Sequence, residues 1–371
     1  MLGWRHKYDE GAEMTFIKRA STAASLLATL CLAAPAVAAP YTTMFVFGDS
    51  LSDVGNFSIA TGGTAPDPSH YSNGRFTNGL NYADYLWNSL GFSGSLSPSF
   101  AGGTNYAIGG ARTDYSTFDV GPGGLPPAVL PTPGSTGYNL SLQGELSLFN
   151  SRTGGVADPN ALYVLWIGSN DLQDILALAG IGNIAAANAR LAVSVGNTAA
   201  AVNSLVAQGA RNILLPTVPD LGVVPAISSR GPGASAAGSA YSNAYNSLLN
   251  VALSGLISGT TDLDLMRFDT FSLLDDVVTN PVRYDFTNTT TPCMQNYYVN
   301  GPLNPGLPVP PACSNPDQAV FWDIIHPTTA THNILADLMY TEVPEPESLA
   351  LCGVGLLGLG AMRRRMQQTM A

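Results

Sequence analysis

Short, continuous apolar runs that end abruptly in polar or turn residues constrain the fold of this chain most. Four such runs cover residues 43–47, 161–167, 211–218 and 263–268. Runs of this length and character indicate strands that are buried on both faces, as in a parallel sheet covered by helices.

The segments between these runs complete the expected architecture. Residues 183–208 and 235–257 are rich in Ala, Leu and Asn and are long enough for crossover helices, and Pro327 stands at a helix-start position. We therefore expect an α/β fold, a three-layer α/β/α sandwich with a mostly parallel sheet. Residues 113–140 and 280–318 are rich in Gly, Pro and Asn and are expected to be surface loops.

The distribution of charge excludes several classes of function. Residues 39–340 contain 8 Arg, no Lys and 20 Asp plus Glu, a formal charge of −12, within a chain of net charge −11. A body this acidic repels phosphate backbones, which argues against nucleic-acid binding. Because it has no lysine, it has neither a P-loop lysine nor a lysine for Schiff-base chemistry.

The N-terminal residues 1–38 have the pattern of an extension followed by a signal peptide. Lys18 and Arg19 precede an apolar run at residues 23–34, and residues 36–38 are the small residues Ala-Val-Ala. Signal peptidase recognises this order of basic, apolar and small residues. We expect cleavage near Ala39 and export of the chain; the alternative is a short buried helix.

The C-terminal residues 343–371 form a second targeting pattern. Val-Pro-Glu-Pro at residues 343–346 is followed by an apolar stretch at 349–362 and by three arginines at 363–365. This order resembles the PEP-CTERM sorting signal. The resemblance implies a short transmembrane helix, contact with the membrane only through this tail before processing, and a PEP-CTERM sorting enzyme of a Gram-negative bacterium as partner. A plain C-terminal membrane anchor is the alternative.

Two cysteines lie in the body of the chain, Cys293 and Cys313. In an oxidising compartment we expect them to form a disulfide that closes a Pro- and Asn-rich loop. The alternative is a pair of unpaired buried thiols. No histidine lies beside either cysteine, so the sequence predicts no metal site here.

Three polar clusters stand at the ends of expected elements: residues 48–53 and 168–171 each follow a strand, and residues 323–327 precede the last helix. In open α/β sheets, active sites gather beyond the carboxyl ends of the strands. The first cluster offers a serine hydroxyl, Ser50, at the expected start of the next helix. The second offers an amide that can donate to an oxyanion. In the third, Asp323 is three residues before His326 and can hold the imidazole in the tautomer that deprotonates a serine.

These clusters resemble the conserved blocks of the GDSL, or SGNH, esterase/lipase family. The segment that commonly follows the first block in larger members also has a counterpart. The matching segments, in family order, are residues 47–56, 73–79, 105–111, 168–171 and 323–326. The resemblance implies that residues 39–342 form an SGNH-hydrolase-like, flavodoxin-like sandwich.

The resemblance also implies roles for individual residues. Ser50 becomes the nucleophile, His326 the base and Asp323 its orienting carboxylate. The oxyanion hole would comprise the Ser50 backbone amide, the Asn170 side chain and the amide of Gly110, with the adjacent Gly109 as the alternative. No metal or cofactor is implied.

Each of these residues has a purely structural alternative. Ser50 can be a helix cap, and Asn170 with Asp171 can be a turn or cap pair. His332, in the expected last helix, is predicted to have a surface or packing role. We expect Asp49 to be a hydrogen-bonding neighbour of the nucleophile and not the partner of the histidine.

The sequence therefore predicts an exported serine ester hydrolase that acts on carboxylic esters, either lipid or short-acyl esters, in the periplasm, at the cell surface or outside the cell. An esterase for acetylated polysaccharide is an alternative of the same chemistry. A catalytically silent surface or matrix protein on this fold is an alternative of another class.

Overall fold

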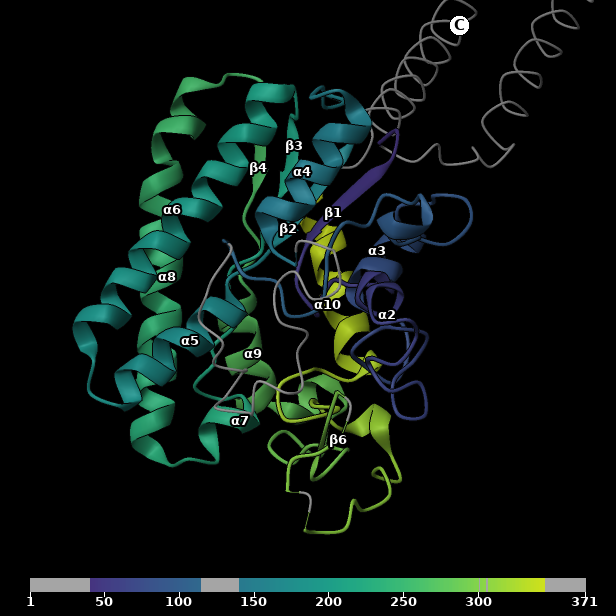
Figure 1. The fold of residues 1–371 in the computed structure, drawn as a ribbon, viewed down its shortest axis with the longest axis vertical. Helices are drawn as coiled ribbons and strands as arrows, with labels where there is room; N and C mark the ends of the chain where they lie inside the picture. Colours follow the sequence, from purple (N-terminus) through teal and green to yellow (C-terminus); the bar gives the residue numbers. More distant parts are fainter. Residues whose placement is uncertain (1–40, 115–139, 300, 305, 344–371) are drawn as a thin grey trace, which may run out of the picture. The chain divides into compact units, whose positions relative to one another are not determined.

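The computed structural model describes residues 41–114, 140–299, 301–304 and 306–343, which belong to one compact unit (Figure 1). The predicted signal peptide and the tail beyond residue 343 lie outside the described residues, as does most of the predicted loop 113–140. Among the described residues, no helix has the length and hydropathy needed to cross a membrane.

The centre of this unit is a four-stranded parallel sheet in the order β1-β2-β3-β4. Its strands are β1 Met44–Gly48, β2 Leu162–Trp166, β3 Asn212–Leu214 and β4 Asp264–Met266. Each of the four apolar runs thus contains one strand. The third strand is shorter than its run because proline follows at 216, and proline has no N–H for the ladder.

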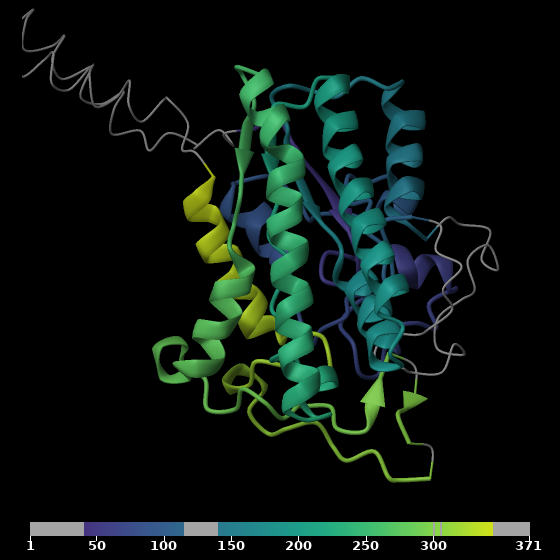
Figure 2. The same cartoon turned by 90° about the vertical axis from the view of Figure 1, so that its left-hand side faces the viewer.

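Helices cover both faces of the sheet. The α-helices of the described residues are α2 Asn56–Ala60, α3 Tyr82–Ser89, α4 Leu142–Thr153, α5 Ser169–Gly180, α6 Ile184–Gln208, α7 Pro225–Ser228, α8 Pro232–Gly259, α9 Thr270–Thr279 and α10 Thr329–Glu342. Short 3₁₀ turns lie at Ser99–Ala101, Pro281–Tyr284 and Pro316–Gln318. The predicted crossover helices are α6 and α8, which face the viewer in Figure 2.

Alternate residues of each strand enter different cores. On β2, Tyr163 and Leu165 pack in the core shared with α4, α5, α6 and α8, whereas Val164 and Trp166 pack in the core shared with α3 and α10. Because both faces of the sheet are buried, the strands are apolar along most of their length, and the polar residues Asn212 and Asp264 stand only at the first positions of β3 and β4. The expected three-layer α/β/α sandwich with a parallel sheet is confirmed.

Two details differ from the sequence prediction. The last helix begins at Thr329, two residues after Pro327, because the Thr328 hydroxyl accepts from the Thr331 N–H and caps it. The segment 280–318 is a surface loop only in part. It contains a two-stranded sheet, β5 Tyr297–Tyr298 and β6 Gly301–Pro302, and the β5 residues are buried.

A disulfide closes this segment. Cys293 is bonded to Cys313, with Cα atoms 4.6 Å apart. Cys293 and its neighbour Met294 are buried with Tyr71 and Trp322 in a small separate core. The cross-linked segment therefore packs against the third polar cluster.

Candidate active site

The first polar cluster forms a tight turn at the carboxyl end of β1. Gly48 has φ +151°, and a Cβ placed there would lie 2.2 Å from the Trp166 carbonyl oxygen, so the turn requires glycine. Ser50 follows within this turn and is 8% exposed. Helix α2 begins only at Asn56 with Gly55 as its N-cap, so Ser50 neither begins nor caps that helix.

The structure brings Ser50, His326 and Asp323 together. His326 Nε2 lies 2.8 Å from Ser50 Oγ, and His326 Nδ1 lies 2.7 Å from Asp323 Oδ2. Asp323 Oδ1 accepts the backbone N–H groups of Ile325 and His326, each at 2.8 Å. Asp323 and His326 are almost fully buried. With Asp323 bonded to Nδ1, the neutral imidazole presents its unprotonated Nε2 to the serine hydroxyl, as a general base must.

A tyrosine that the sequence did not single out completes the contacts of Asp323. The Tyr71 hydroxyl donates to Asp323 Oδ2 at 2.7 Å and accepts from the Val299 N–H at 2.9 Å. Burial, followed by the nearby Asp323 charge, raises the pKa of Tyr71 well above its usual value, so it remains a donor. Tyr71 lies just before the segment 73–79, but no residue pattern connects it to a carboxylate 252 positions away.

Two aromatic rings enclose the imidazole. The Tyr298 ring is parallel to the His326 ring, with centroids 5.8 Å apart, and the Phe76 ring lies at 5.1 Å. Both rings are buried. Their packing limits rotation of the imidazole and excludes water from its faces.

The two glycines of the second block, Gly109 and Gly110, differ in their hydrogen bonds. The Gly109 N–H donates to Asp53 Oδ2 at 2.8 Å, so it is already engaged. Among the described residues, no acceptor contacts the N–H of Gly110 or that of Ser50. Gly110 has φ +79°, a left-handed conformation that favours glycine. These contacts favour Gly110 over Gly109 as a donor to an external oxygen.

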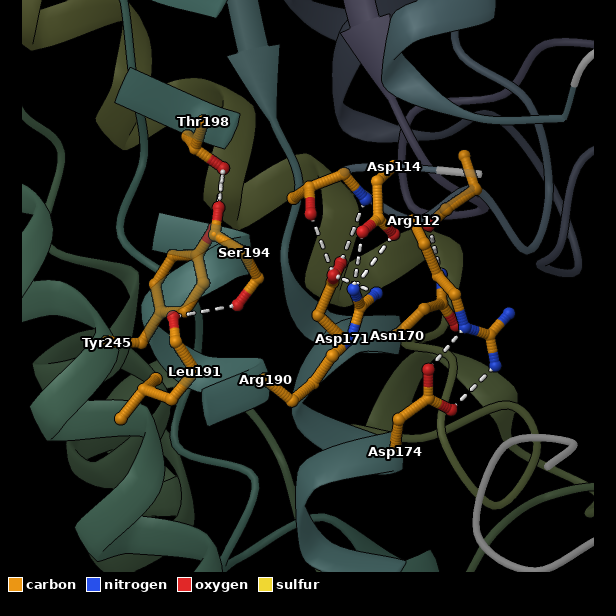
Figure 3. A network of polar contacts seen from close by, with 12 residues as sticks. Arg112, Asp114, Asn170, Asp171, Asp174, Arg190, Leu191, Ser194, Thr198 and Tyr245 are labelled. Atoms are coloured by element: carbon orange, nitrogen blue, oxygen red, sulfur yellow. Dashed lines mark hydrogen bonds and ion pairs between the residues drawn. The ribbon is translucent and has the colours of Figure 1, made fainter. Parts of the chain in front are cut away.

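Asn170 lies in the first turn of α5, whose N-cap is Gly168. One N–H of its side-chain amide donates to the Ala111 carbonyl at 2.9 Å (Figure 3). The contact joins the second block to the third. The N-cap of α5 is Gly168, and Asn170 and Asp171 lie inside the first turn. The interpretation of the Asn170–Asp171 pair as a helix cap is therefore wrong.

Buried ion pairs fix this junction (Figure 3). Arg112 donates two hydrogen bonds to Asp174, at 2.5 and 2.8 Å. Asp171 accepts from the backbone and hydroxyl of Thr113 and, at 2.6 Å, from Arg190. Paired charges with several hydrogen bonds hold a defined geometry, since breaking one leaves an uncompensated charge. The network therefore sets the position of the segment around Gly110 relative to α5.

Buried carboxyls hold the turn that contains Ser50. Asp53 accepts the backbone N–H groups of Gly55, Asn56 and Phe57, and burial is the main cause that raises its pKa to about 6. Asp49 accepts the Leu51 N–H, while its Oδ2 has no partner among the described residues. Burial raises the pKa of Asp49 to about 7. Asp49 is thus a hydrogen-bonding residue next to Ser50 and does not contact His326 Nδ1, as expected.

The remaining described histidines have other surroundings. His332 is 1% exposed within α10, its ring is parallel to that of Tyr82, and burial lowers its pKa to about 3. It is therefore a neutral packing residue. His70 contacts Asp67 at 3.1 Å in a surface turn. The described residues contain no group of three or more His, Cys, Asp or Glu side chains arranged to hold a metal ion.

Comparison with known proteins gives two family matches. The GDSL-like lipase/acylhydrolase model matches residues 44–339, and the PEP-CTERM protein-sorting motif matches residues 342–365. Together they account for nearly all of the chain after residue 43.

Curated relatives have modest identity. Esterase EstA of Pseudomonas aeruginosa is 29% identical over 89% of this chain and 51% of its own length. An uncharacterised Pseudomonas putida protein is 31% identical over 88% of this chain and 52% of its own length. The chain thus spans about half the length of these relatives. A GDSL esterase/lipase of Arabidopsis thaliana is 27% identical over 81% of this chain and 85% of its own length.

A solved structure of an acetyl xylan esterase variant from Geobacillus stearothermophilus is 13% identical, with a TM-score of 0.40, and covers 84% of this chain and 97% of its own. This similarity is too low to support an argument about substrate.

Proposed function

The chain belongs to the GDSL-like lipase/acylhydrolase family and carries a C-terminal PEP-CTERM sorting motif, and from this premise we propose that it is an exported serine ester hydrolase. It cleaves carboxylic esters through an acyl-enzyme on Ser50. The observation that carries the proposal is the continuous chain of contacts from Ser50 Oγ through His326 to Asp323, at 2.8 and 2.7 Å.

Attack on the ester begins at Ser50. A free hydroxyl is a weak nucleophile near neutral pH, so His326 Nε2 takes its proton as Oγ attacks the carbonyl carbon. Asp323 holds the imidazole by its Nδ1–H and stabilises the imidazolium that forms. Tyr71 keeps Asp323 in place and shares its charge.

The attack turns the carbonyl oxygen into an oxyanion. We assign its stabilisation to the backbone N–H groups of Ser50 and Gly110 and to the side-chain amide of Asn170. Among the described residues neither backbone N–H has an acceptor, and the ion pairs around Arg112 fix the distance between the two segments. Donors held in advance need no reorganisation during the reaction, and each contributes about 3 kcal/mol by analogy with oxyanion-hole deletions.

Collapse of the intermediate breaks the bond between the carbonyl carbon and the alcohol oxygen. His326 gives its proton to the departing alcohol, and the acyl group stays on Ser50. Water then attacks the acyl-enzyme, His326 again takes the proton, and the acid leaves with Ser50 regenerated.

Two alternatives to this function, a catalytically silent protein and an acetyl-polysaccharide esterase, can be tested by measuring activity and substrate preference. A catalytically silent surface or matrix protein would not need His326 within hydrogen-bonding distance of Ser50 together with two unengaged donors nearby. An acetyl-polysaccharide esterase would share the chemistry and differ only in substrate.

Export and processing are also part of the proposal. Signal peptidase removes residues 1–38, and a PEP-CTERM sorting enzyme cleaves the tail near Pro344 after a brief membrane contact. The matched sorting motif supports export from a Gram-negative bacterium. Mass spectrometry of the mature protein should find no peptide that contains Arg363. Recovery of the intact C-terminus would favour a plain anchor.

The esterase proposal is tested with purified protein and chromogenic acyl esters. Ser50→Ala should abolish turnover because the attacking oxygen is absent, while circular dichroism shows a folded protein. Ser147→Ala, which changes an exposed serine of α4, should behave like the wild type. Equal activity of folded Ser50→Ala and wild type would refute the proposal.

A further inference from the structure

An apolar cavity opens beside the Ser50 hydroxyl. Its wall is almost entirely apolar and comes from the loop after β3 and from α7, α9 and α10. Most of its polar members lie near Ser50 in the active site: Asp49, Ser169, Asn170, Gln173 and His326.

Two further polar residues on the wall are threonines whose hydroxyls are already used. The Thr270 hydroxyl donates to the Thr217 carbonyl at 2.6 Å, and the Thr331 hydroxyl donates to the Val320 carbonyl at 2.8 Å. Away from the polar residues near Ser50, the wall of the cavity therefore offers a ligand almost no free hydrogen-bonding group.

Helical periodicity explains how the sequence builds this wall. On α9 the lining residues are Thr270, Leu273, Leu274 and Val277, which have the spacing of one helix face. On α10 they are Thr331, Ile334 and Leu335. Such a stripe usually packs into the core, where interiors are close-packed. Here parts of both stripes face a cavity, and Leu273, Leu274 and Ile334 are only half-buried.

We propose that this cavity binds the acyl chain of the substrate and that the enzyme acts on esters of medium-chain aliphatic acids in preference to acetyl esters. The inference rests on the proposed esterase function and specifies its substrate class. An acetyl group carries one methyl beyond the carbonyl carbon and leaves most of this wall uncovered. Each methylene that moves from water into such surroundings favours binding by about fourfold.

One of the proposed oxyanion donors lies on the wall of the cavity. Asn170 borders the cavity, and Gln173 lies one turn further along α5 on the same wall. A carbonyl carbon at Ser50 with its oxygen at Asn170 therefore lies at the cavity, and we assign the acyl chain, which stays on Ser50 in the acyl-enzyme, to the apolar wall. An acetylated polysaccharide would place only its acetyl group in this cavity, because the sugar is the alcohol side of the ester, and most of the apolar wall would stay uncovered.

Two isomeric esters, which have the same molecular formula, test whether the cavity binds the acyl chain or the alcohol chain. Ethyl hexanoate has the longer chain on the acyl side, and hexyl acetate has it on the alcohol side. We expect kcat/KM, measured by pH-stat titration below the solubility limit, to be at least about tenfold higher for ethyl hexanoate, since four methylenes enter the cavity. Equal values, or faster hydrolysis of hexyl acetate or acetylated xylan, would overturn the inference.

A variant that narrows the cavity tests the wall itself. Leu274→Trp places a larger ring on the half-buried face of α9, and the ratio of kcat/KM for ethyl hexanoate to that for ethyl acetate should fall at least about fivefold, because two or more methylenes lose their place. Leu248→Trp is the matched control, since Leu248 is 45% exposed on α8 and outside the cavity. An unchanged ratio in Leu274→Trp would contradict the proposal.

If circular dichroism shows that Leu274→Trp does not fold, Leu274→Ala replaces it. The wider cavity should then raise the ratio for ethyl octanoate over ethyl hexanoate, and an unchanged ratio counts against the cavity as the acyl site. Failure of the underlying function is distinguishable. Absence of Ser50-dependent hydrolysis of every ester refutes the esterase proposal, whereas Ser50-dependent hydrolysis without chain-length preference refutes only the acyl site.

Discussion

Replacement of Asp49 by asparagine should make the free energy of unfolding of the protein less dependent on pH. Asp49 is 2% exposed, and Oδ2 of its carboxyl has no hydrogen-bond partner among the described residues. Burial is the main cause that raises its pKa from 3.8 to about 7, while the Leu51 N–H acts in the opposite direction. Asparagine keeps an oxygen for Leu51 and does not ionise.

The sign and size of the effect follow from linkage between protonation and folding. Between about pH 4 and pH 7 the folded wild type retains a proton that the unfolded chain has released, so its stability falls as pH rises through this window. The difference of about 3 pH units corresponds to about 4 kcal/mol in total, at about 1.4 kcal/mol per unit. Above pH 7 this contribution is constant, because both states are ionised.

Urea unfolding at pH 5, 6, 7 and 8 measures the effect. The free energy of unfolding of Asp49→Asn minus that of the wild type should increase from pH 5 to pH 7 and then level off, since the other titrating groups are common to both proteins and cancel. A difference that stays flat over this range, or that decreases, would refute the account of Asp49 as a buried carboxyl protonated below neutral pH.

Three further predictions concern the site and its supports. Asn170→Ala should lower kcat by roughly 10²-fold while labelling of Ser50 by an organophosphonate stays detectable, because one oxyanion donor is lost; wild-type kcat would exclude that role. Tyr71→Phe should cost about 2 kcal/mol in urea unfolding and lower kcat, because Asp323 loses a donor and a buried N–H loses its acceptor. Tyr163→Phe, whose hydroxyl bonds a backbone carbonyl at the far end of β2, should leave kcat unchanged, and equal kcat losses in both variants would contradict the specific role of Tyr71. Alkylation of the denatured, unreduced mature protein should label neither Cys293 nor Cys313, and two labelled cysteines would contradict the disulfide.

Strands and blocks could be predicted from the sequence because their signals are local. A strand buried on both faces must be apolar at every position, so residues 161–167 were recognisable without knowledge of their neighbours. Likewise, Asp323 and His326 are three positions apart, and that short separation carries most of their geometry.

Features that depend on contacts between residues far apart in the chain could not be predicted from the sequence. Tyr71 and Tyr298 reach the triad from loops far away in the chain, and no local pattern marks either. The choice between Gly109 and Gly110 depended on a hydrogen bond to Asp53, 56 positions earlier. The segment 280–318 has the composition of a loop, but the disulfide and the small core beneath it bury part of the segment.

The first residue of the helix after β1 could also not be predicted from the sequence. Ser50 was expected to begin it, as serine commonly does. Instead, the carboxyl of Asp53 accepts three successive N–H groups, and the helix begins at Asn56. This leaves the Ser50 hydroxyl free of a capping role and directed at His326.

Covalent labelling shows directly whether the Ser50 oxygen is the nucleophile. Purified protein is treated with an alkyl organophosphonate, digested and mapped by tandem mass spectrometry, with His326→Ala as the matched variant that keeps the serine. We expect one adduct, on Ser50, and we expect it to form at the same rate as esterase activity is lost. In His326→Ala the adduct should form much more slowly. Inactivation with the adduct on another residue, or full esterase activity after complete labelling of Ser50, would contradict this role of Ser50.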